Sequence, residues 1–363
     1  MATTLTQMKA VAIAPKFTAL PSAIASAINV ALILRRGKNN RKAYHRLVLG
    51  MSACNFLAST AWFCTTWPIP SETPGTYGAV GNQQTCVSLD LCTARTVCLF
   101  RCLTLRAAAP PRSPRRCSAQ AFFAQSSLST VVYNGSLALY YYLVIVRGWH
   151  DDQIARVEPF LHTYAVAWGL GTALASLALG LFNQVGWDCW ISPAPLGCQE
   201  SWNAPPGVAG TCARGDNGSL YQWAFYYAPL WFVILLVAGL MYAVYHDVLS
   251  QEQRLARAAA NSSGRDVSMT QTKRVAHQAA LYVGAMLVAW LFPTIFQLVI
   301  VTTGALPFPL LFLTALFIPI QGLLNLFVFT HSAFVGYRQD HPGPSLLTAW
   351  FGMLKQELNK DWG

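Results

Sequence analysis

Charged side chains are scarce in this sequence. Asp, Glu, Lys and Arg make up 11% of its 363 residues, whereas roughly 25% is usual for a soluble domain. Hydrophobic residues account for 54% of the chain, and its mean hydropathy is +0.37. A soluble fold cannot bury so much apolar surface, so the composition excludes an ordinary soluble domain and predicts an integral membrane protein.

Several local signals are also missing. No Ala-x-Ala-like cleavage site follows a short apolar segment at the N-terminus, so we expect the first spanning helix to direct membrane insertion itself. The sequence contains no metal-ligand cluster, P-loop or nucleophile constellation. It therefore gives no support for an enzyme, a metal site or a bound cofactor.

Seven apolar runs meet the length of about 20 residues that a spanning helix needs. They are continuous rather than alternating, which predicts an all-α bundle of seven transmembrane helices and not a barrel. We expect a short outer N-terminus (1–16), a bundle (17–336) and a tail (337–363). The predicted spans are 17–34, 47–67, 121–146, 160–182, 223–245, 280–301 and 306–329.

The formal net charge of +11 is unevenly distributed. Basic residues cluster between runs one and two, three and four, five and six, and in the tail, whereas the other side has only Lys9, Lys16 and Arg214 outside residues 87–117. The positive-inside rule places the N-terminus outside and the C-terminus in the cytoplasm. The basic loops then set topology and contact membrane lipids, and we expect no nucleic-acid partner. Asn217 begins an Asn-Gly-Ser sequon in an outer loop and is a predicted glycosylation site.

Residues 87–117 do not fit this pattern. The segment places six arginines and four of the ten cysteines on the predicted outer side, and Arg101 and Arg106 interrupt its apolar part. One interpretation is a retained intron or a lineage-specific insertion. The alternative is a mobile cationic lid that attracts an anionic ligand.

Charged residues are absent from all seven predicted spans. Ion-coupled transporters and proton pumps usually need ionisable groups within the membrane, so the pattern argues against both. The predicted seventh helix has no lysine, which excludes retinal bound as a Schiff base. A transporter or channel for an uncharged solute stays open.

Five places in the sequence resemble G-protein-coupled receptors of the slime-mould cAMP-receptor-like and secretin-type (class B) groups. They are RKAYHRLVLGMSACNFLAS (41–59), the TC…SAQAFF junction, YNGSLALYYYLVIVRGW (133–149), Asp188-Cys189-Trp190 and PIQGLLNLFVF (319–329). The likeness covers roughly residues 17–336 apart from 87–117. It implies a plasma-membrane receptor for an extracellular ligand, partnered by a heterotrimeric G protein. A receptor remnant that does not signal is a further alternative.

Two features depart from these groups. Only about 16 residues precede the first predicted span, where secretin-type receptors carry a large hormone-binding domain. We therefore do not expect a large peptide hormone as ligand. Helix three ends in Val-Arg-Gly-Trp instead of the Asp-Arg-Tyr triplet of rhodopsin-type receptors, so that activation switch does not transfer.

The resemblance also implies a disulfide from the top of helix three to the second outer loop. Cys189 matches the loop cysteine, and Cys117 is the favoured partner, with Cys86 as the alternative because it would precede the helix if residues 87–117 were absent. Cys198 and Cys212 would then pair within the loop.

Polar and proline residues in the spans are further candidates. Trp290 and Pro293 predict a kinked sixth helix, which in this receptor fold swings to admit the G protein; a purely structural kink is the alternative. Buried amides need partners within the membrane, so the helix-seven residues act as a switch or as interhelical glue. A polar stripe in helix three predicts a pocket. The helix-seven residues are Gln321, Gly322 and Asn325. The helix-three stripe consists of Gln125, Ser126, Ser129 and Asn134.

Three basic residues lie at the predicted inner boundary. Arg147 ends helix three, and His45 and Arg46 open helix two. They are candidates for contacting the G protein or locking helices together, and topology-setting residues that reach the headgroups are the alternative. In the tail, Leu346, Leu347, Trp350, Phe351, Leu354 and Leu358 share one helical face. This pattern predicts a short amphipathic C-terminal helix at the membrane interface.

Overall fold

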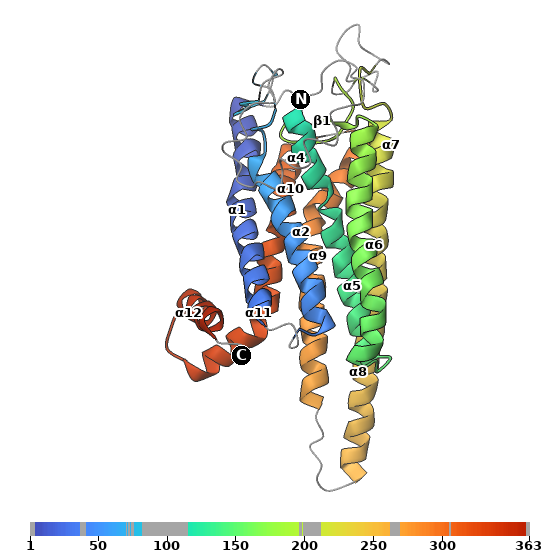
Figure 1. Cartoon of the computed structure of the whole chain (residues 1–363), viewed down its shortest axis with the longest axis vertical. Helices are drawn as coiled ribbons and strands as arrows, with labels where there is room; N and C mark the ends of the chain where they lie inside the picture. Colours follow the sequence, from blue (N-terminus) through green and yellow to red (C-terminus); the bar gives the residue numbers. More distant parts are fainter. Residues whose placement is uncertain are drawn as a thin grey trace.

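The computed structural model describes residues 4–36, 41–69, 71, 73, 76–81, 115–195, 198, 212–261, 269–304 and 306–360. Cys86 and residues 87–114 of the predicted insertion lie outside these ranges. The described chain forms a seven-helix bundle, which confirms the predicted fold class. Figure 1 shows the helices running side by side, with the N-terminus at one end and the C-terminal helix α12 beside the other.

Several of the seven spanning units are built from more than one helical segment. The first four are α1 (Leu5–Arg35), α2 (Ala43–Cys64), α4 with α5 (Arg115–Gln125, Leu128–Ile145) and α6 (Asp151–Ala178). The fifth unit consists of α7 (Gly218–Gln222), the π-helix η2 (Trp223–Tyr227) and α8 (Ala228–Asn261). The sixth is α9 (Met269–Thr303). The seventh consists of α10 (Phe308–Phe317), the 3-10 helix η3 (Ile318–Ile320) and α11 (Gln321–Asp340). Strands β1 (Phe182–Gln184) and β2 (Cys189–Ile191) form an antiparallel hairpin, and α12 spans Leu346–Asn359.

Helix α1 begins well before the predicted span. Residues 5–16 of the expected outer N-terminus are helical and continue directly into the predicted span. A capping box starts the helix: the Gln7 backbone N–H donates to Thr4 Oγ1 (3.3 Å), and the Thr4 N–H donates to Gln7 Oε1 (2.9 Å). Pro15 and Pro21 lie inside α1, as neighbouring helices allow in a spanning helix. Lys9 and Lys16 are therefore helical residues.

Helix α6 is displaced from its predicted span of 160–182. It begins at Asp151 and ends at Ala178; Gly180 then turns the chain at a φ of +66°, and Phe182 belongs to β1. Six helices of the described residues are long and apolar enough to cross a membrane, and α6 is not among them. Its first turns carry acidic and basic residues, including the buried Glu158, which lies two residues before the predicted span.

Large apolar side chains point outward along the bundle. Phe17 and Phe160 are both 73% exposed, and Leu235 on α8 is 67% exposed. Exposed apolar surface on this scale matches a bundle surrounded by lipid. At the end where α12 lies, α8 and α9 extend beyond their neighbours (Figure 1).

Candidate functional site

The end of the bundle that carries the β1–β2 hairpin is tied together by a disulfide. Cys117 of α4 bonds to Cys189 of β2, the pair favoured above, and Cys198 bonds to Cys212. Asp188, directly before Cys189, is buried, and no hydrogen-bond partner meets its carboxyl oxygens within the described residues. Burial raises the pKa of this carboxyl well above its usual value, and the nearby Cys189 backbone N–H lowers it by a smaller amount.

A chain of aromatic contacts leads inward from this hairpin. The Trp190 indole N–H donates to Gln125 Oε1 (2.8 Å), and the ring centroids of Trp190 and Tyr226 are 5.1 Å apart. Tyr226 in turn lies 5.7 Å from Trp290 of α9 and its hydroxyl is 3.0 Å from Ser127 Oγ. The disulfide-bonded hairpin is thus connected, ring by ring, to the middle of α9.

The predicted pocket residues of helix three do not meet in one cavity. Only Gln125 joins the aromatic chain. Ser126 Oγ donates to the Phe123 carbonyl (2.6 Å), and Ser129 packs against Gly169 of α6. Asn134 Nδ2 donates to the Thr130 carbonyl (2.9 Å), and its side chain borders a void of about 10 Å³ between α5, α8 and α9. That volume suits about one water molecule, not a ligand.

The helix-seven candidates lie between α11, α1 and α2. Gln321, Gly322 and Asn325 are all buried. The Gly322 N–H donates to Ser22 Oγ of α1 (2.9 Å), and Ser59 of α2 donates to the same oxygen (3.0 Å). A Cβ at Gly322 would collide with Ser22 and Ser26. This close helix packing is the glue that small residues provide within membranes.

Pro293 lies inside α9, where a proline cannot supply the backbone N–H of a helical hydrogen bond. Trp290, one turn earlier, is 4% exposed. Among the described residues, its indole nitrogen has no hydrogen-bond partner. One turn of α9 therefore contains both the backbone hydrogen bond that Pro293 cannot make and the contact of Trp290 with the aromatic chain.

The inner candidates behave differently from one another. Arg46 forms a two-pronged ion pair with Glu158 of α6, with both N–O distances at 2.5 Å. His45 Nε2 lies 2.7 Å from Arg36 Nη1, next to the end of α1. Arg147 is exposed, and within the described residues no hydrogen bond or ion pair joins its side chain to α9. Arg46 therefore joins α2 to α6, whereas Arg147 is free to reach headgroups or a partner.

Sequence reasoning missed the contact that holds α9 at this end. The Tyr44 hydroxyl of α2 lies 3.0 Å from the Tyr282 hydroxyl of α9 and accepts a hydrogen bond from Gln278 Nε2 (2.7 Å). Tyr44 also stacks on Phe329 of α11, with ring centroids 6.3 Å apart. No sequence signal marks this group, because Tyr44 precedes His45 and Arg46 as an ordinary aromatic residue.

Asn217, the predicted glycosylation site, is exposed and precedes α7. No group of three or more His, Cys, Asp or Glu residues that could hold a metal ion occurs in the described part of the chain.

Comparison with known proteins identifies the fold. No family model and no curated protein sequence matches the chain. A crystal structure of squid rhodopsin superimposes with a TM-score of 0.62 over 100% of this chain and 88% of the rhodopsin chain, at 11% sequence identity. The bundle therefore has the seven-helix fold of G-protein-coupled receptors.

Proposed function

We propose that this chain is a plasma-membrane receptor that couples an extracellular ligand to heterotrimeric G proteins. The fold is that of a receptor class with this activity. The excess of basic residues at the end carrying α12 supports a cytoplasmic C-terminus. The finer assignment, to the cAMP-receptor-like and secretin-type groups, is supported by the five sequence segments that resemble them.

The observation that carries the proposal is the way α9 is held at two points along its length. Its N-terminal half is tied to α2, because the Tyr282 and Tyr44 hydroxyls are hydrogen-bonded to each other and Gln278 Nε2 donates to the Tyr44 hydroxyl. Its middle, at Trp290, contacts the aromatic chain that starts at the outer hairpin. A ligand that displaces Trp190 or Tyr226 would shift the population of α9 positions, and release of its inner end would open a groove for the G protein.

The test is guanine-nucleotide exchange on co-expressed G-protein α subunits, in membranes that carry the full chain or a chain lacking residues 87–117. Exchange above mock membranes supports the proposal. Exchange by the shortened chain alone means that the segment disables a receptor. Silence of both chains at confirmed surface expression, across a broad panel of α subunits, contradicts it and favours transport of an uncharged solute.

A further inference from the structure

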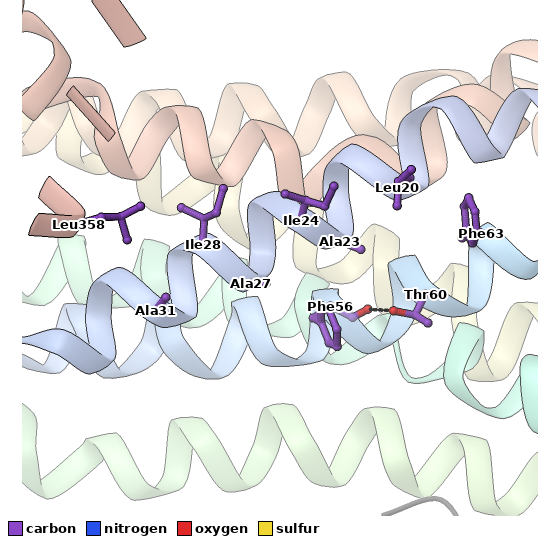
Figure 2. A pocket seen from close by; sticks show the side chains of 10 residues that line it. All are labelled: Leu20, Ala23, Ile24, Ala27, Ile28, Ala31, Phe56, Thr60, Phe63 and Leu358. Atoms are coloured by element: carbon purple, nitrogen blue, oxygen red, sulfur yellow. Dashed lines mark hydrogen bonds between the residues drawn. The ribbon is translucent and has the colours of Figure 1, made fainter. Parts of the chain in front are cut away.

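An apolar groove runs along the lipid-facing surface between α1 and α2 and has a volume of about 540 Å³. Figure 2 shows three alanines of α1 along it, Ala23, Ala27 and Ala31, with Phe56 of α2 opposite and Leu358 of α12 at one end. No charged side chain of the described residues lines the groove. Its contents must therefore be apolar.

The shape of the groove follows from its residues. Alanines spaced by four residues share one face of a helix, and their methyl groups leave open the space that larger side chains would fill. Helix α12 closes one end with Leu358 and is fixed in place by two contacts. The Trp350 ring packs on Phe327 of α11 with centroids 5.0 Å apart, and Gly352 lies against Tyr337.

Two basic residues follow in sequence on the helices that meet at this closed end. Arg35 follows Ala31 by four residues and continues the same face of α1. Lys355 precedes Leu358 by three residues on α12. Both side chains are exposed. Glu357, the one acidic residue of α12, forms an ion pair with Lys360 at 3.7 Å.

We infer that the groove binds an anionic phospholipid, with one acyl chain along the alanines and the phosphate between Arg35 and Lys355. Lipid tails fill apolar grooves in a bilayer without a hydrophobic gain, so selectivity has to come from the headgroup. Basic residues beside a spanning helix attract anionic headgroups of the inner leaflet. A sterol carries no charge to match the two cations, and a second copy of α1 on the alanines would bring its own Arg35 to the same end.

Native mass spectrometry of the purified full chain tests this site. The chain is equilibrated with equal amounts of dioleoylphosphatidylglycerol and dioleoylphosphatidylcholine, which differ only in headgroup. The wild type should retain one phosphatidylglycerol preferentially. Ala27→Phe fills the groove and should abolish retention of that lipid. The double variant Arg35→Gln, Lys355→Gln should lose the preference, by about fivefold for each cation removed.

Two matched controls accompany these variants. Gly239→Phe adds the same ring on α8, where a Cβ meets nothing within 4 Å, and Arg147→Gln removes an exposed cation elsewhere at the same end. Both should behave as the wild type. The double variant changes only exposed side chains, so it decides the matter if Ala27→Phe fails to fold.

Four results would overturn the site: equal retention of the two lipids by the wild type, retention unaffected by Ala27→Phe, displacement of phosphatidylglycerol by cholesterol, or a monomer–dimer shift in Ala27→Phe without lipid loss. The measurement uses no G protein, so its outcome is independent of the proposed receptor activity.

Discussion

Replacing Tyr44 by phenylalanine removes the hydroxyl that ties α9 to α2 and leaves its ring in place. Two hydrogen bonds are lost, to Tyr282 (3.0 Å) and from Gln278 (2.7 Å). Each neutral hydrogen bond contributes about 0.5–1.5 kcal/mol, so the closed position of α9 loses about 1–3 kcal/mol relative to the open one. Since about 1.4 kcal/mol is a factor of ten, ligand-independent activity should rise by a factor between about 5 and about 140.

The assay is nucleotide exchange on a co-expressed G-protein α subunit without ligand, at matched surface levels of receptor. Gln278→Leu removes one of the two hydrogen bonds and should raise basal exchange less than Tyr44→Phe, by a factor between about 2 and about 12. Tyr140→Phe is the control, because its ring lies 6.2 Å from that of Tyr44 but, within the described residues, its hydroxyl forms no hydrogen bond to α9. Unchanged exchange in Tyr44→Phe, or the same rise in Tyr140→Phe, would refute the reasoning.

Three further predictions concern stability, each measured by thermal unfolding in a fixed detergent. Arg46→Met should destabilise the fold by about 3 kcal/mol, because it leaves the Glu158 carboxylate, which is 9% exposed, without its partner. Glu158→Gln should cost only about 1 kcal/mol, because Arg46 is 39% exposed and can rehydrate. Equal losses in the two variants would contradict this. Burial raises the pKa of Asp188 in the folded state. The wild type should therefore lose stability as the pH rises from the unfolded-state pKa of about 3.9 through the raised folded-state pKa. Asp188→Asn should flatten that decline, and an equal decline in Asp188→Asn would exclude Asp188 as its source. Cys189→Ser removes a disulfide that joins residues 72 positions apart and should lower the free energy of unfolding by about 4 kcal/mol. Cys212→Ser removes one that joins residues 14 positions apart and should lower it by about 3 kcal/mol. Adding Cys117→Ser to Cys189→Ser should cost little more, and a second full loss would mean that the two cysteines act separately.

Local signals in the sequence were enough to predict the seven-helix class. Hydropathy is summed over about 20 residues, so each apolar run could be judged without knowing its neighbours. The same method failed at boundaries, where caps decide: Thr4 with Gln7 starts α1 early, and Gly180 ends α6 before Phe182. Because the predicted fourth span starts at residue 160, it leaves out Glu158, which the structure places in α6.

Long-range partners were beyond reach. Arg46 was singled out at the correct end of helix two, but its partner lies 112 residues away on α6. Tyr44 and Tyr282 are separated by 238 residues, and neither stands out by type or spacing. Conversely, Gln125 was one of four polar residues on helix three, and only the packing of Trp190 distinguishes it from the others.

The ties within the bundle differ in strength, and the difference indicates which helix is able to move. The Arg46–Glu158 ion pair joins α2 to α6, and the Tyr133 hydroxyl of α5 contacts His162 Nδ1 of α6 at 2.9 Å. Of these two contacts the Arg46–Glu158 pair is charged, and leaving the mostly buried Glu158 without Arg46 costs about 3 kcal/mol. Within the described residues, two neutral hydrogen bonds join the N-terminal half of α9 to α2, and a coupling energy of about 1–3 kcal/mol is what allosteric ligands usually supply. Under the proposed receptor function, α9 is therefore the helix that a ligand would release, and α2, α5 and α6 form the frame against which it would move.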